Sequence, residues 1–133
     1  MIILRQGNFS INYKQLFPRV DKNLSFDIEG TLPENIVKSI LKDWKNTIVK
    51  NIWNYELEVG KNELKKNNLK EQDFADGLQL FEVSYGVWND DTIELTFSAA
   101  KNTKLYDIYS SDFFWCLSFS GKTGKFINLL AGD

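Results

Sequence analysis

Acidic side chains and aromatic rings gather in the second half of this 133-residue chain. Residues 71–112 contain two lysines, Lys101 and Lys104, and nine carboxylates: Glu71, Asp73, Asp76, Glu82, Asp90, Asp91, Glu94, Asp107 and Asp112. Trp88, Tyr106 and Tyr109 lie in the same stretch. Carboxylates could serve as general acids and bases or as ligands of a divalent cation. Carboxylates beside aromatic rings are also typical of protein-recognition surfaces, because charges steer encounter and rings supply binding energy.

The spacing of the carboxylates does not match an acid–base or metal motif. Asp90 and Asp91 are adjacent, and neighbours on an extended chain point to opposite faces. Asp73 and Asp76 lie beside Gly77 in an expected loop. The chain contains no histidine, the commonest general base and transition-metal ligand. We therefore expect a non-enzymatic protein with no catalytic residue, cofactor or metal, and we keep a carboxylate-based, metal-dependent enzyme as an alternative.

Two further patterns, a possible phosphate loop and a single cysteine, do not indicate a functional site. Gly121-Lys122-Thr123 resembles the end of a phosphate loop, but Cys116 stands where that loop needs a glycine, so we interpret it as a hairpin turn. Cys116 is the chain's single cysteine, which excludes an intramolecular disulfide. It lies in an apolar run, so we expect a buried, inert thiol.

The charge changes sign along the chain. Residues 1–70 hold 12 of the 16 basic and 8 of the 18 acidic residues, whereas residues 71–133 have a net charge of −6. The overall charge of −2 and a pI of about 5.2 argue against a nucleic-acid partner, which favours basic domains. The apolar stretch near Met1 is too short for a signal peptide or a membrane span, so we expect a cytoplasmic protein without a membrane partner.

One amphipathic helix is predicted over residues 32–55. Thr31 and Glu34 have the spacing of a capping box, and Pro33 suits a first helical turn. Apolar residues then recur at three- and four-residue steps: Ile36, Val37, Ile40, Leu41, Trp44, Ile48, Val49 and Ile52. Residues 56–60 fit either helix or strand.

Elsewhere the hydrophobic period is mostly two, which predicts strands. Short strands are expected at 9–13 and 24–28, and hairpins at 79–98 and 113–130, the first of which turns at residues 89–91. Segments 61–77 and 99–112 are interpreted as connections, the first with room for a short helix. The sequence thus predicts a single α+β domain over 1–133, with an antiparallel sheet of about five to six strands and one long amphipathic helix packed on it.

The aromatic residues do not all fit a core. Trp88 is out of phase with Tyr85 and Val87, so it is expected on the opposite face of its strand. Rings exposed beside carboxylates predict a protein-binding surface built from loops 71–77, 89–91 and 105–112. Its candidate residues are Asp73, Asp76, Trp88, Asp90, Asp91, Tyr106, Asp107, Tyr109 and Asp112.

The arrangement of residues 71–133 resembles that of small bacterial immunity proteins of contact-dependent-inhibition and related polymorphic toxin systems. The resemblance lies in a lone helix followed by the Phe81–Phe97 hairpin and then Phe113–Leu130. It implies a cytoplasmic protein that neutralises a cognate toxin by occlusion, and an acidic partner can occlude a cationic nuclease by imitating the charge of its substrate. A structural or assembly subunit of phage or mobile-element origin is the other alternative.

Overall fold

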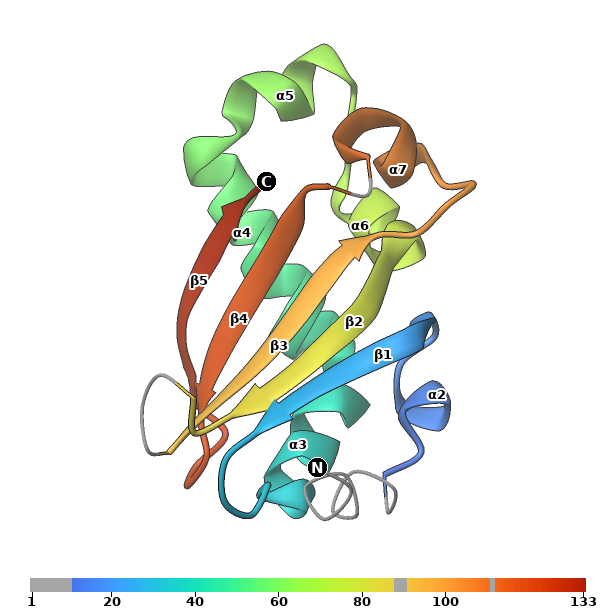
Figure 1. Ribbon diagram of the computed structural model, residues 1–133. Helices are drawn as coiled ribbons and strands as arrows, with labels where there is room; N and C mark the ends of the chain where they lie inside the picture. The colour runs from blue at the N-terminus through green and yellow to red at the C-terminus, as the bar shows by residue number, and fades with distance from the viewer. Residues whose placement is uncertain (1–10, 88–90, 111) are drawn as a thin grey trace.

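The computed structural model describes residues 11–87, 91–110 and 112–133. Its five strands form one sheet in the order β1-β2-β3-β4-β5 (Figure 1). The strands are β1 (Val20–Ile28), β2 (Leu78–Tyr85), β3 (Thr92–Ala99), β4 (Phe114–Ser120) and β5 (Phe126–Gly132). The α+β class and a mostly antiparallel sheet of five strands are therefore confirmed.

Both predicted hairpins are present. Val83 of β2 pairs with Leu95 of β3, and Leu117 of β4 pairs with Leu129 of β5, all in antiparallel register. The prediction of an antiparallel sheet throughout was wrong at one edge, because β1 pairs with β2 in parallel. The helices between these two strands return the chain to the end of the sheet from which β1 started, as a parallel pair requires.

The single helix predicted over 32–55 was also wrong, because the helical stretch is interrupted. It consists of α3 (Glu34–Lys42), the π-helical turn η1 (Lys45–Val49) and α4 (Lys50–Val59), so most of the segment left open at 56–60 is helical. The break frees the backbone carbonyl of Ile40, which accepts a hydrogen bond of 2.7 Å from the Thr47 hydroxyl. Pro33 is the N-cap of α3 and no side chain caps the helix, so the expected capping box does not form.

Two connections contain helices that the sequence pattern did not define. The segment 61–77 forms α5 (Lys61–Lys66) and α6 (Glu71–Gly77), and the connection 99–112 contains α7 (Lys104–Tyr109). The strand expected at 9–13 is wrong at Tyr13, where α2 (Tyr13–Leu16) begins; Phe9 and Ser10 lie outside the described residues. These helices are short, and tertiary packing rather than a long amphipathic repeat defines them.

The helices α3 and α4 lie behind the sheet in Figure 1, and none of the described helices crosses its front face. The core fills the space between sheet and helices, with Ile40, Ile52, Phe97 and Trp115 almost fully buried. No helix in the described part of the chain is long and apolar enough to cross a membrane. We call the uncovered side of the sheet the open face.

Candidate functional site

Six of the predicted site residues lie on α6, α7 or the residues that follow α7, at one end of the sheet (Figure 1). Asp73 is used structurally, since it accepts a hydrogen bond of 2.8 Å from the Lys70 backbone N–H and pairs with Lys104 at 3.4 Å. Asp76 accepts a hydrogen bond from Gln72. Tyr106 is half-buried against the core, and Asp107 and Asp112 are exposed.

Of the other predicted residues, Asp91 lies at the opposite end of the sheet. Asp91 accepts a hydrogen bond of 2.9 Å from the Tyr85 hydroxyl, and its backbone carbonyl accepts one from the Gly121 N–H. The first bond lies within the β2–β3 hairpin, and the second ties Asp91 to the β4–β5 turn. Trp88 and Asp90 lie outside the described residues. Because an eight-residue strand spans about 27 Å, the structure does not bring Asp91 together with α6 and α7.

Tyr109 faces inward, toward a buried carboxylate. Its hydroxyl donates to Oε1 of Glu56 at 3.0 Å, while Nε1 of Trp115 donates to Oε2 of the same carboxylate at 3.0 Å. Glu56 is 3% exposed, and a Cβ atom at Gly60 would collide with its carboxylate. Burial first, and then the charge and hydrogen bond of Glu56, raise the pKa of the Tyr109 hydroxyl.

A different set of carboxylates meets on the open face. Asp27 of β1 lies opposite Ser84 of β2, which lies opposite Glu94 of β3. Glu82 lies one step along β2 on the same face, opposite Thr96. Diagonal neighbours on adjacent strands are about 7–8 Å apart, so three acidic residues from three strands share one surface.

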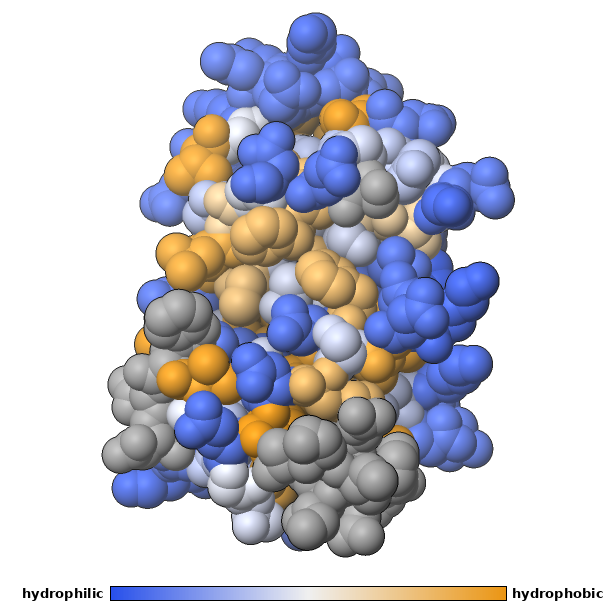
Figure 2. All heavy atoms as spheres, in the orientation of Figure 1, coloured by the Kyte–Doolittle hydropathy of each residue, from blue (hydrophilic) through white to orange (hydrophobic). Residues whose placement is uncertain are grey.

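Apolar side chains continue this surface across β4 and β5. Phe81, Phe114 and Cys116 line a groove of about 450 Å³ together with Asp27, Glu82 and Glu94. Leu130 of β5, which is 64% exposed, is the register partner of Cys116. Figure 2 shows a hydrophobic band over the middle of this face with hydrophilic residues around it. The open face therefore carries carboxylates on β1 to β3, with apolar side chains beside them on β2, β4 and β5.

The open-face carboxylates repel one another, and no cation within 11–87, 91–110 and 112–133 forms an ion pair with them. Among the described residues, the ion pairs are Lys50–Glu71 and Lys104–Asp73, and both lie elsewhere. Burial and the charges of Glu82 and Asp27 raise the pKa of Glu94, whereas the hydrogen bond from Ser118 lowers it. The Ser118 hydroxyl donates to Oε2 of Glu94 at 3.5 Å, which is too long for a strong bond.

Two other polar groups of the groove bear on its chemistry. The Ser84 hydroxyl belongs to a residue only 8% exposed, and it makes no hydrogen bond within the described ranges of the chain. Cys116 is free and half-buried, which corrects the expectation of a fully buried thiol. Burial first, and then Glu94 and Glu82, raise the pKa of its thiol, while a hydrogen bond with Thr96 lowers it. The thiol thus stays protonated and weakly nucleophilic at neutral pH.

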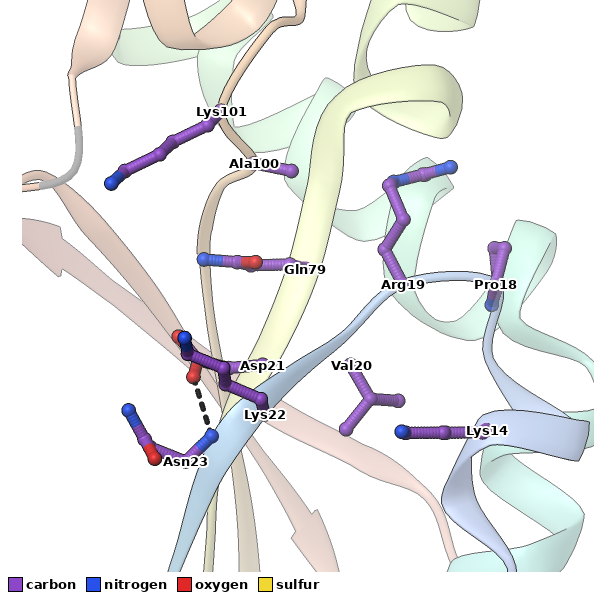
Figure 3. Close-up of a pocket in the computed structure, with 10 residues that line it drawn as sticks. All are labelled: Lys14, Pro18, Arg19, Val20, Asp21, Lys22, Asn23, Gln79, Ala100 and Lys101. Carbon is purple, nitrogen blue, oxygen red and sulfur yellow. Dashed lines mark hydrogen bonds between the residues drawn. The ribbon is translucent and has the colours of Figure 1, made fainter.

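A larger hollow of about 790 Å³ lies at the start of β1, and its lining includes four cations and one carboxylate, Asp21. Figure 3 shows that Arg19 turns away from Lys101 and toward α6. Its guanidinium donates to the backbone carbonyls of Leu78, at 2.8 Å, and Ala75. These two hydrogen bonds give Arg19 a structural role. Lys14, Lys22 and Lys101 are the other cations around this hollow.

The sequence pattern contained part of the open-face site. Glu82 and Glu94 alternate with apolar residues on their strands, which predicts a polar side for each strand. What the pattern lacked was the parallel pairing of β1, which adds Asp27 to the same surface. In the described part of the chain, no three His, Cys, Asp or Glu side chains form a cluster that could hold a metal ion.

Comparison with protein-family models, with curated proteins and with solved structures found no match to this chain. A functional assignment therefore rests on the geometry of the site.

Proposed function

We propose that this chain is a non-enzymatic protein-binding module of the immunity-protein kind, which neutralises a cognate toxin by docking a cationic segment of it on the open face. The observation that carries the proposal is a group of three carboxylates, Asp27, Glu82 and Glu94, which form no ion pair with any described residue and lie beside Phe81 and Phe114 in one groove. We favour this surface over the loops predicted from the sequence, because Asp73 and Asp91 are engaged in hydrogen bonds that hold the fold together.

The electrostatics favour a cationic occupant. Burial and neighbouring carboxylates make the charge on Glu94 unfavourable in the free protein. A lysine or arginine from a partner would remove that repulsion and gain attraction in a partly desolvated site. Such a surface attracts a cationic toxin, such as a nuclease, and speeds its encounter at low salt.

The apolar part of the groove would supply contact area. Half-buried Phe81 and Phe114 and the exposed Leu130 resemble the composition of interface centres, which are rich in aromatic residues and poor in lysine. Ser84 lines the groove, and its hydroxyl, which makes no hydrogen bond within the described residues, is available to donate to a carbonyl of the partner. The mechanism proposed is occlusion: the bound segment of the toxin is withheld from its target.

The test uses the protein encoded directly upstream of this chain's gene, where a cognate toxin is expected. Its C-terminal domain is expressed in a bacterial host with this chain or with the double variant Glu82→Lys/Glu94→Lys. Rescue of growth by the native chain and its loss in the variant are expected. In purified form, the variant should bind the toxin domain at least about tenfold more weakly, and native binding should weaken with added salt.

The matched control is Asp76→Lys/Asp107→Lys, which makes the same change of charge on the exposed side of α6 and α7. This control should bind and rescue like the native chain, and circular dichroism should show that both variants are folded. Loss of rescue in the control alone would move the interface to α6 and α7. Absence of rescue by the native chain would contradict the immunity function itself.

A further inference from the structure

Four polar side chains meet at one place on the open face, two from β2 and two from β3. Glu82 lies opposite Thr96, and Ser84 lies opposite Glu94. All four line the groove of about 450 Å³. The carboxylates therefore occupy one diagonal of this four-cornered site, and the hydroxyls occupy the other. Diagonal neighbours on adjacent strands are about 7–8 Å apart, so a small planar group can lie between the two carboxylates.

A β-bulge adds an aromatic ring to the four-cornered site. The register between β2 and β3 shifts by one residue between Leu80 and Glu82, and the extra residue is Phe81. Phe81 and Glu82 therefore both line the groove, although neighbours on a regular strand point to opposite faces. The Phe81 carbonyl accepts a hydrogen bond of 3.3 Å from the Ser25 hydroxyl of β1. Bulges re-aim side chains beside functional sites, and this bulge places a ring next to a carboxylate.

The Ser84 hydroxyl is an unused polar group of the same site. Ser84 is 8% exposed, and it makes no hydrogen bond to any described residue. Its neighbour Val83 is buried in the core, so the alternation along β2 turns Ser84 toward the groove that it lines. Buried polar groups usually have a hydrogen-bond partner, and a missing one costs free energy. Ser84 thus indicates a ligand independently of the carboxylates.

We propose that the four-cornered site binds the guanidinium group of an arginine side chain of the partner. This inference rests on the proposed function, because it specifies which residue of the cationic segment enters the groove. A guanidinium is planar and carries five N–H donors in a fixed fork. It can therefore donate to Glu82 and to Glu94 at once, while the Ser84 hydroxyl accepts a further N–H.

Three features of the site favour arginine over lysine. The two carboxylates come from different strands, and a fork with donors on several edges reaches both better than the point charge of an ammonium group does. The Phe81 ring beside Glu82 can stack on a planar guanidinium. A guanidinium is also more weakly hydrated, so it loses less on entering a groove in which Glu94 is itself partly desolvated.

The test is an NMR titration of the isotope-labelled chain with the N-acetyl methylamides of arginine, lysine and citrulline. Citrulline keeps the shape of arginine and lacks its charge. We expect the arginine probe to shift amide signals of β2 and β3 with a Kd of about 1–10 mM, since a single side chain supplies only part of an interface. The lysine probe should bind at least about fivefold more weakly, and the citrulline probe should not bind.

Three variants locate the bound guanidinium. Glu82→Gln/Glu94→Gln removes both charges and should abolish binding of the arginine probe. Phe81→Leu removes the ring and keeps an apolar side chain, and Ser84→Ala removes the hydroxyl. Each of these two should weaken binding at least about threefold, since each removes one of several contacts.

The matched controls make the same changes outside the groove. Glu58→Gln alters an exposed carboxylate of α4, and Phe126→Leu alters a phenylalanine of β5 that is 40% exposed. Both controls should bind the arginine probe like the native chain. Circular dichroism checks that every variant is folded.

The outcomes separate this inference from the proposed function, because the titration needs no toxin. Absence of arginine binding, equal binding of arginine and lysine, binding of citrulline, or equal binding by the native chain and the double variant would each overturn the arginine site, even in a chain that rescues growth. Preference for arginine that the double variant abolishes would support the site. Failure to rescue growth would then contradict the immunity function alone.

Discussion

The two faces of the sheet use carboxylates in opposite ways. On the helix-covered face, Glu56 is buried and both of its oxygens accept hydrogen bonds, from Tyr109 and Trp115. On the open face, Asp27, Glu82 and Glu94 repel one another, and the hydrogen bond that Glu94 accepts from Ser118 is long. The same chemical group thus stabilises the fold on one side and costs free energy on the other.

This difference suggests where to look for function. A carboxylate that is fully hydrogen-bonded inside the protein is explained by folding, whereas a set that repels itself on an uncovered surface is not. Natural proteins tolerate such unfavourable charges where a partner relieves them. Substitutions on the two faces should therefore shift stability in opposite directions.

The largest effect is expected for Glu56→Ala. The substitution leaves the Tyr109 hydroxyl and the Trp115 N–H buried without an acceptor, and it opens a cavity between α4 and the sheet. We expect a loss of about 3 kcal/mol in the free energy of unfolding, measured by urea denaturation. Glu58→Ala, at an exposed position of the same helix, is the control and should change stability little. Equal effects of the two would show that Glu56 is not a structural anchor.

A smaller loss is expected for Tyr109→Phe. This change removes one of the two donors to Glu56 and keeps the ring, which packs 5.0 Å from Trp115 between centroids. A hydrogen bond to a charged group contributes about 1.5 kcal/mol or more, so the loss should be of that order. Tyr106→Phe makes the same change on the same helix, where the hydroxyl makes no hydrogen bond to the described residues. That control should be neutral in the same denaturation experiment.

On the open face, Glu94→Gln should stabilise the protein at neutral pH. Burial, Glu82 and Asp27 raise the pKa of Glu94 in the folded chain above its unfolded value, so its charge opposes folding once it is ionised. The cost is fully present above the folded pKa and vanishes as the pH falls below the unfolded pKa. We expect a gain below about 1 kcal/mol at pH 7, because the group is partly exposed, and none near pH 3. A loss of stability at pH 7 would contradict the repulsion.

The smallest effect concerns the Cys116 thiol. Its raised pKa should make alkylation by iodoacetamide slower in the folded chain than in urea at the same pH. Glu94→Gln removes one of the charges that raise this pKa and should increase the folded-state rate. An unchanged alkylation rate in the variant would show that the charge of Glu94 does not raise the pKa of the Cys116 thiol.

The sequence predicted the elements whose signals are local. The hairpins at 79–98 and 113–130 combine a period of two with turn residues, and both are present. The helical period from Ile36 onward was found, but the break after Lys42 depends on packing and on the Thr47 hydroxyl. The parallel pairing of β1 with β2 joins residues 57 to 60 positions apart in sequence, which no local pattern encodes.

The surface that we propose differs in its residues from the one that the sequence predicts. The surface proposed here consists of acidic and aromatic residues on the outward sides of strands, whereas Asp73 and Asp91 of the predicted surface make hydrogen bonds within the fold. Tyr109 points inward because its hydroxyl donates to Glu56. The sequence did indicate that Glu56 is buried, since it falls four residues after Ile52 on the apolar face of the helix.

The most direct test of the contrast between the two faces is urea denaturation at pH 7 of Glu82→Gln/Glu94→Gln beside Glu56→Gln. Both variants remove charge and keep side-chain size. We predict that the open-face double variant is at least as stable as the native chain, while Glu56→Gln loses about 1 kcal/mol or more. A loss of more than about 1 kcal/mol in the open-face variant would contradict the account, since its carboxylates would then hold the fold together rather than await a partner.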